Sequence, residues 1–210
     1  MNPLKKRFLN IYLKLFGKDQ KTRNRKRLRQ KIKVTPLRVV VGAEGSFQQG
    51  WIGTEIDTLN LLKKRDWKML FKPGIIDVIL AEHVWEHLTD EEGQLALRNC
   101  FTYLKKGGYF RVAVPDGFNP DQNYLDYVKP GGHGAGADDH KLLYNYQLMK
   151  AYLEKAGFKV HLLEYFDEYG VFHYNEWKPE DGLIRRSRRF DERNKNGKLN
   201  YTSLIVDAIK

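Results

Sequence analysis

The chain of 210 residues contains a single cysteine, Cys100, so no disulfide can form within it. A lone thiol is compatible with a reducing compartment, and its place on an apolar helical stripe predicts a core residue without chemistry. No run approaches the ~20 consecutive apolar residues that a membrane-spanning helix needs. Asn10 and Lys14 interrupt the first apolar stretch, which argues against a secretory signal. We therefore expect a cytoplasmic protein.

Positive charge is concentrated in the first residues. Residues 1–33 hold thirteen Lys and Arg against one Asp, a net charge of +12 within a chain total of +11, which leaves about −1 elsewhere. We interpret residues 1–34 as a basic arm. Its apolar residues recur at three- and four-residue steps and predict one helical face, formed by Leu4, Phe8, Ile11, Tyr12, Leu15 and Phe16.

Two kinds of partner fit such a basic amphipathic arm. It could lie on an anionic membrane surface, which would place the protein at the inner face of the membrane. It could equally pack on the protein's own body or on another protein. Contact with nucleic acid fits less well, because the rest of the chain is nearly neutral.

Residues 35–210 are long enough for one domain with a single core. Apolar runs predict strands near 37–41, 51–55, 76–81, 109–114, 159–165 and 203–208, and helical patterns predict helices near 90–104 and 142–156. We expect glycines to end both helices, Gly107 and Gly108 the first and Gly157 the second. Alternation of strand and helix predicts an α/β fold with a doubly wound, mostly parallel sheet.

Two neighbouring segments suggest a nucleotide-sized site. The run VVVGAEG at residues 39–45 is an apolar strand that ends in a glycine turn, and GWIGTEID at residues 50–57 is a second strand that ends in acidic residues. Gly42 and Gly45 would let the backbone pass close under a ligand, and Glu55 could accept hydrogen bonds from both hydroxyls of a ribose. The alternative is an ordinary connection whose glycines only supply positive φ.

Later motifs extend this pattern. They are IIDVILAEHVWEHL at 75–88, LKKGGYFRVAVPDG at 104–117 and GADDHKLLYNY at 136–146. From Leu37 to the C-terminus, the order of these motifs resembles the class I S-adenosylmethionine-dependent methyltransferases, and more narrowly the bacterial predicted methyltransferases of the type 11 family. The resemblance implies a Rossmann-like sheet and S-adenosyl-L-methionine as the cofactor.

The resemblance also implies roles for individual residues. Glu82 and His83 would lie at a strand end beside the methionine part of the cofactor, and Asp66 with Trp67 would contact adenine. Glu86 and His87 would form hydrogen bonds to the start of the next helix.

The glycine turn departs from the family pattern. Where relatives usually carry Gly-Cys-Gly, this chain has Gly42, Ala43 and Glu44. The Glu44 carboxylate would either take the ammonium group of the cofactor or crowd its carboxypropyl tail. Only residues 46–49 separate Gly45 from Gly50, so the usual helix at this point is absent, and we expect the basic arm to supply the missing cover.

Methyl transfer to a hydroxyl or amine needs an in-line acceptor and a base. The candidate bases are His140, which Asp138 or Asp139 could orient, and Asp116, whose carboxylate would need a raised pKa. The alternative for His140 is a hydrogen bond within its own loop, with Asp139 capping the following helix. The long segment 116–140 is the expected source of the substrate site.

The segment EHVWEH invites a comparison with zinc motifs, since His83 and His87 are four residues apart. Because Glu86 does not directly follow His83 and no third ligand is evident, we predict no metal site.

Four arginines, Arg185, Arg186, Arg188 and Arg189, could clamp an anionic acceptor, or could form a solvated turn paired with Asp191 and Glu192.

The sequence thus predicts a methyltransferase. The absence of an NPPY-type tetrapeptide favours a small molecule, or a precursor of a cell-envelope glycan or lipid, as the acceptor. A non-catalytic binding module and an RNA methyltransferase that uses the arm are the alternatives.

Overall fold

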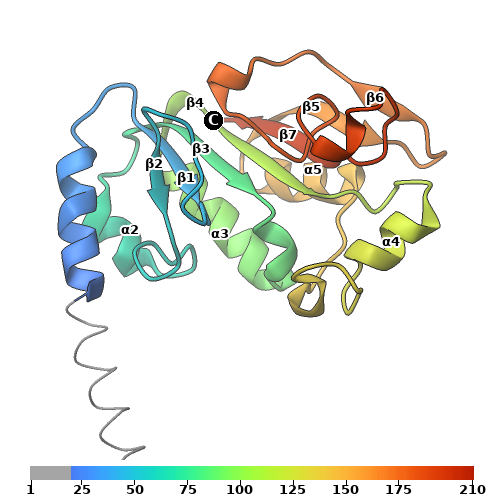
Figure 1. Cartoon of the computed structure of the whole chain (residues 1–210). Helices are drawn as coiled ribbons and strands as arrows, with labels where there is room; N and C mark the ends of the chain where they lie inside the picture. The colour runs from blue at the N-terminus through green and yellow to red at the C-terminus, as the bar shows by residue number, and fades with distance from the viewer. Residues whose placement is uncertain (1–19) are drawn as a thin grey trace, which may run out of the picture.

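Figure 1 shows the computed structural model, which describes residues 20–210 and is built on one seven-stranded sheet of order β2-β1-β3-β4-β7-β5-β6. The strands are β1 (Arg38–Val41), β2 (Ile52–Thr54), β3 (Ile76–Glu82), β4 (Leu104–Pro115), β5 (Lys159–Phe166), β6 (Phe172–Tyr174) and β7 (Ser203–Ile209). Strands β2, β1, β3 and β4 pair in parallel, whereas β7 runs antiparallel between β4 and β5. The predicted Rossmann-like, mostly parallel sheet is confirmed.

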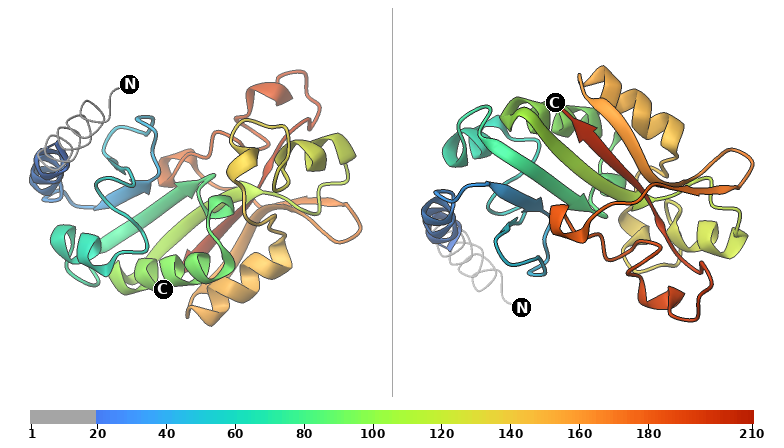
Figure 2. Two further views of the ribbon diagram at one scale, coloured as in Figure 1. Left: turned by 90° about the horizontal axis from the view of Figure 1, so that it is seen from below. Right: turned by 90° about the horizontal axis from the view of Figure 1, so that it is seen from above.

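One face of the sheet is covered by α-helices. These are α2 (Lys64–Leu70), α3 (Asp90–Tyr103) and α5 (Tyr146–Lys155). Alternate strand residues point toward them, as the pleat requires, so Val39 and Val41 of β1 belong to this core with Leu97 of α3 and Met149 of α5. Figure 2 shows α3 and α5 together on this side.

The opposite face is covered by residues 177–190, which we call the C-terminal cover. Val40 and Leu80 of the sheet pack there against Trp177 and Ile184 in a second buried cluster. In Figure 2 this orange-to-red segment lies on the side away from α3 and α5. No helix separates Gly45 from Gly50, as predicted. From the sequence we expect the basic arm, or the helix at its C-terminal part, to replace that helix. Among the described residues the C-terminal cover occupies this face and the helix over residues 20–31 does not, whereas residues 1–19 lie outside the described part of the chain.

Buried charged groups hold the C-terminal cover in place. The Arg111 guanidinium on β4 makes two hydrogen bonds to Asp207 of β7, at 2.7 and 2.8 Å, and a third to the Gly182 carbonyl at 2.7 Å. On β5, the buried Glu164 carboxylate accepts from Trp177 Nε1 at 3.0 Å and from the Arg188 backbone N–H at 2.7 Å. Charge-assisted bonds of this kind are stronger than neutral ones, so the segment is fixed although it contains little regular structure.

The helix over residues 20–31 packs beside α2. Leu28 is buried there, Arg25 Nη2 lies 2.6 Å from Asp66 Oδ1, and Arg29 Nε donates to the Met69 carbonyl at 2.7 Å. The apolar face predicted for residues 4–16 lies outside the described residues. Within residues 20–210 no helix has the length and apolar character needed to cross a membrane.

Two helix boundaries show how local chemistry sets the elements. A capping box of Thr89 and Glu92 begins α3, which ends at Tyr103 ahead of the predicted glycines, because β4 already begins at Leu104. Helix α5 begins four residues later than predicted, since Asn145 caps it by accepting from the Leu148 N–H at 2.9 Å. Gly157, with φ of +102°, follows its end as predicted.

Candidate active site

Two cavities lie at the carboxyl ends of β1, β2 and β3. The first, of about 400 Å³, is named here the Glu55 cavity; its wall also includes Gly42, Glu44 and the apolar pair Leu61 and Leu62. The second, of about 380 Å³, is named the Arg186 cavity. Both have Gly42, Glu44, His83 and His87 in their walls. Two ligands bound in these cavities would therefore meet at a shared wall.

The glycine turn between β1 and β2 lies under this shared wall. Gly42 has φ of +62°, and a Cβ there would come within 2.6 Å of Val84 Cγ2, so only glycine fits without strain. Glu44 also has positive φ, +46°, and its exposed side chain reaches both cavities. The Gly45 N–H donates to Glu55 Oε1 at 3.4 Å. The turn and the acidic strand end are thus brought together, as expected for a ribose site.

Asp66 and Trp67 do not reach the Glu55 cavity, and the expectation that they contact adenine is corrected. Asp66 Oδ2 accepts from the Asn60 N–H at 3.1 Å, and its other oxygen pairs with Arg25. The fully buried Trp67 ring donates through Nε1 to the Leu61 carbonyl at 3.0 Å. Both residues therefore fix the loop that presents Leu61 and Leu62 to the cavity.

At the end of β3, Glu82 and His83 lie beside the shared wall. Glu82 Oε1 accepts from the Arg186 backbone N–H at 2.8 Å. His83, with φ of +56°, has Nε2 at 2.9 Å from Ser203 Oγ and Nδ1 at 2.9 Å from Glu86 Oε1. The buried Glu86 side chain thus pairs with His83 and makes no hydrogen bond to the start of α3, which corrects that expectation. Burial opposes its ionisation, yet the neighbouring His83 and His87 hold the pKa of Glu86 below its ordinary value.

His140 lies in the wall of the Arg186 cavity and is almost fully buried. Its Nδ1 is 2.6 Å from the Val128 carbonyl, so this backbone oxygen orients the ring, in place of the expected Asp138 or Asp139. Asp139 instead faces His87, with Oδ2 3.4 Å from Nδ1. Nor does Asp139 cap α5, whose cap is Asn145. With Nδ1–H donating, Nε2 of His140 is free to take a proton.

Asp116 is not part of either cavity wall, and its expected role as a base is corrected. The side chain is fully buried, and its oxygens accept from the Phe118 N–H at 3.0 Å and the Phe166 N–H at 2.8 Å. Burial raises the pKa of this carboxyl to about 6, although the two N–H groups oppose the shift. Asp116 therefore ties the end of β4 to the end of β5.

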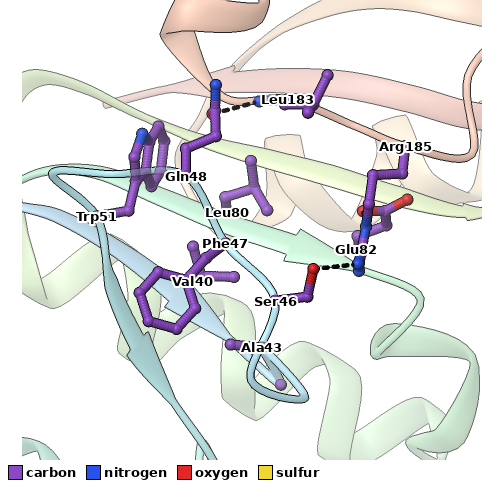
Figure 3. A pocket seen from close by; sticks show the side chains of 11 residues that line it. Val40, Ala43, Ser46, Phe47, Gln48, Trp51, Leu80, Glu82, Leu183 and Arg185 are labelled. Carbon is purple, nitrogen blue, oxygen red and sulfur yellow. Dashed lines mark hydrogen bonds and ion pairs between the residues drawn. The ribbon is translucent and has the colours of Figure 1, made fainter. Parts of the chain in front are cut away.

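A third cavity, of about 180 Å³, lies where the C-terminal cover meets the loop after β1, and we name it the Gln48 cavity (Figure 3). Gln48 joins the two segments, accepting from the Leu183 N–H at 2.9 Å and donating to the Pro179 carbonyl at 3.0 Å. Arg185 Nη1 donates to Ser46 Oγ at 2.6 Å and lies between this cavity and the Arg186 cavity. The C-terminal cover thus contributes to the walls of both the Gln48 cavity and the Arg186 cavity.

A comparison with known protein families identifies the family of the chain. A family model described as a methyltransferase domain matches residues 6–112, just over half of the chain. The chain belongs to this methyltransferase family. S-adenosylmethionine is accordingly the cofactor of the domain, as the sequence predicts. Among curated proteins no similar sequence was found.

Solved structures with similar folds include other methyltransferases. One is a SAM-dependent methyltransferase from Archaeoglobus fulgidus, at 16% identity and TM-score 0.42, with 90% of this chain and 92% of that one covered. Another, from Thermotoga maritima, is described as a possible histamine N-methyltransferase, at 14% identity and TM-score 0.48, with 97% and 96% covered. A phosphoethanolamine N-methyltransferase from Haemonchus contortus has 12% identity and TM-score 0.44, with 90% and 52% covered. These likenesses carry no information about the acceptor.

The arginine segment of the methyltransferase divides into two groups. Arg185 and Arg186 lie in the wall of the Arg186 cavity, together with Arg193, which sequence reasoning missed. Arg188 and Arg189 instead face Glu176, at 3.4 and 3.8 Å. Arg188 and Arg189 are therefore paired with an acidic residue, but with Glu176 and not with the expected Asp191 or Glu192.

Of the three cavity arginines, two are already paired with carboxylates. Arg193 makes two 2.7 Å bonds to Asp191, and Arg185 lies 3.4 Å from Glu82. Among the described residues, the Arg186 guanidinium has no hydrogen bond or ion pair. The long segment 116–140 contributes Tyr127 and residues 134–137 to the same wall.

Proposed function

We propose that this methyltransferase transfers the methyl group of S-adenosylmethionine to an acceptor that carries an anionic group and is a small molecule or a precursor of a cell-envelope glycan or lipid. The observation that supports the proposal is the shared wall of the Glu55 and Arg186 cavities. Methyl transfer requires donor and acceptor in line across a short distance, and two adjoining cavities provide that arrangement.

The Glu55 cavity has the chemistry to hold the donor. The Glu55 carboxylate, partly buried and already oriented by the Gly45 N–H, is suited to accept from two ribose hydroxyls. Leu61 and Leu62 offer an apolar surface for the adenine ring. Bound here, the sulfonium supplies an activated methyl group, and Glu44 is the nearest candidate partner of the amino acid end.

The Arg186 cavity has the chemistry to hold the acceptor. Within residues 20–210 the Arg186 guanidinium makes no hydrogen bond or close ion pair, and its charge acts at longer range on Asp191. It presents donors that match a phosphate or carboxylate. His140 Nε2 is the group best placed to accept the proton that an acceptor hydroxyl or amine loses. Among the described residues, Arg186 is the one arginine of this wall without a close carboxylate, which suits one anionic group and not a polyanion and favours a small acceptor over RNA.

Calorimetric titration with S-adenosylmethionine and S-adenosylhomocysteine tests the donor site. We expect micromolar binding by the full chain and a loss of at least about tenfold in affinity for Glu55→Ala, because charge-assisted bonds to ligand hydroxyls contribute about 1.5–3 kcal/mol. Asp57→Ala is the matched control, since this exposed carboxylate lies two residues away and outside the cavity wall. Absence of binding by the folded wild type would leave a methyltransferase-shaped binding module.

A further inference from the structure

Three potential metal ligands converge in the wall of the Arg186 cavity. Glu86, His87 and His140 each offer one ligand atom, and these atoms lie within 4.8 Å of one another. Glu86 and His87 come from the 3-10 turn η1 (Trp85–His87), and His140 follows the turn η2 (Ala137–Asp139), more than fifty residues later. The sequence offered only the pair His83 and His87, with no third ligand. The fold supplies the third ligand from a distant loop.

In each histidine ring, one nitrogen lies close to an oxygen atom outside the cluster. His140 Nδ1 lies 2.6 Å from the Val128 carbonyl, and His87 Nδ1 lies 3.4 Å from Asp139 Oδ2. A ring that donates through Nδ1 carries its lone pair on Nε2. Metal-binding histidines are held in the same way, with the second nitrogen donating to a carbonyl or carboxylate. Nε2 is therefore the nitrogen of each ring left to bind a cation, and the ring centroids are 4.8 Å apart.

Glu86 gives an independent indication of a cation. The side chain is fully buried, and Oε2 has no hydrogen-bond partner among the described residues, while Oε1 lies 2.9 Å from His83 Nδ1. A buried carboxylate oxygen without a donor is costly, so such groups are normally paired or coordinate metals. His83, whose two nitrogens are both engaged, acts from outside the cluster to position this carboxylate.

We propose that Glu86, His87 and His140 bind one divalent transition-metal ion, with zinc as the best match. Two imidazoles and one carboxylate form the donor set of many catalytic zinc sites, where the fourth position stays open. In a tetrahedral site with bonds of about 2.0 Å, ligand atoms are about 3.4 Å apart, so the longest separation in the cluster, up to 4.8 Å, must shorten by as much as about 1.4 Å. The His87 side chain is one-third exposed and can make this movement, whereas Glu86 and His140 are held by the core.

The open position would face the Arg186 cavity. With a cation bound, His140 Nε2 is a ligand and no longer a base; the cation takes over this role, because it can bind an acceptor oxygen and lower the pKa of an acceptor hydroxyl. This consequence rests on the proposed function, whereas the metal site itself does not. Zinc binding can therefore be tested in the absence of S-adenosylmethionine and of any acceptor.

The test is a calorimetric titration of the chelator-treated full chain with Zn²⁺, repeated with Co²⁺ as a spectroscopic probe of coordination. We expect one site per chain, and at least a tenfold weaker affinity in Glu86→Gln, His87→Ala and His140→Ala. His161→Ala, which removes an exposed histidine on β5, is the control and should bind as the wild type does.

If Glu86→Gln and His140→Ala fail to fold, His87→Ala still tests the proposal, because the His87 side chain is partly exposed. Equal Zn²⁺ affinity in His87→Ala and His161→Ala, or no Zn²⁺ binding by the folded wild type, would overturn the proposal. Titration of the same samples with S-adenosylmethionine separates this outcome from a failure of the donor site.

Discussion

At the scale of single residues, buried carboxylates have unlike roles that their positions in the chain do not reveal. Glu86 lies among histidines, which lower its pKa, whereas Asp116 accepts only two backbone N–H groups, and burial raises its pKa to about 6. Both follow strand ends, where catalytic residues of α/β folds gather. Only the three-dimensional surroundings separate a group in the cavity wall from one that joins two strands.

The raised pKa of Asp116 gives a prediction for the pH dependence of stability. Its pKa is about 6 in the folded protein against an ordinary value of 3.8, so the folded state binds the proton more tightly between these values. The stabilisation from this proton is fully present below about pH 4 and is lost as the pH rises through about 6. Asp116→Asn cannot titrate, so the wild type's stability relative to this variant should fall by on the order of 2–3 kcal/mol between pH 4 and 7.

Urea unfolding of both proteins across this pH range measures the effect. Other titrating groups are common to the two proteins and cancel in the difference. Parallel stability profiles would show that Asp116 keeps an ordinary pKa in the folded state.

At the scale of elements, the C-terminal cover replaces the missing helix after β1. Helical periodicity marks a helix in a sequence, but an irregular segment that buries isolated side chains has no period to detect. Ile184 is fully buried within DGLIRRSRRF, where the surrounding charges suggest a solvated turn. The backbone of the C-terminal cover accepts a hydrogen bond from Arg111 and donates to Glu164 and Glu82, and such bonds leave little trace in its own sequence.

Ile184→Ala tests whether the C-terminal cover is part of the cooperative core. We expect a loss of about 2–4 kcal/mol in the free energy of unfolding, because the substitution leaves a cavity against Val40 and Leu80. Leu199→Ala, in the same tail but 38% exposed, should cost less than about 1 kcal/mol. Chemical denaturation measures both values, and similar small losses would mean that the segment is only loosely attached.

The regular elements were largely predictable, and the reasons are physical. The core strands contain short apolar runs, such as Val39–Val41 in β1 and Val78–Ala81 in β3, and α3 carries a capping box, so local chemistry agrees with the final fold. The seven-residue helix α4 (Gln122–Val128) and the short strand β6 were missed, because each is too short to show a period. The fold brings together Gly42, Glu44 and Glu55, as predicted. The position of Arg193 in a cavity wall depends on the path of a loop, and so does the grouping of Glu86, His87 and His140. No sequence pattern predicts those paths.

At the scale of the whole molecule, the C-terminal part of the basic arm is joined to the donor side of the fold. Arg25 Nε donates to the Thr58 carbonyl at 2.9 Å, and its guanidinium pairs with Asp66. Asp66 in turn holds the Asn60 N–H, next to the Leu61 and Leu62 that enter the Glu55 cavity. Net charge alone suggested an external partner for the arm, whereas these contacts show that residues 20–31 also pack on the domain.

This connection predicts that Arg25→Met affects both stability and cofactor affinity. The change leaves the Asp66 carboxylate, 5% exposed, without its cation, and we expect a loss of about 2–4 kcal/mol in the free energy of unfolding. The loop over residues 58–62 then loses an anchor, so S-adenosylmethionine should bind several-fold more weakly. Arg27→Met, on the exposed side of the same helix, is the control with unchanged affinity.

A double-mutant cycle with Asp66→Asn isolates the contact from general destabilisation. Because neutralising Asp66 removes the unpaired charge, Arg25→Met should cost at least about 0.5 kcal/mol less in the Asp66→Asn background. Additive losses, together with an affinity equal to that of Arg27→Met, would show that the arm packs on the domain without supporting the cofactor loop.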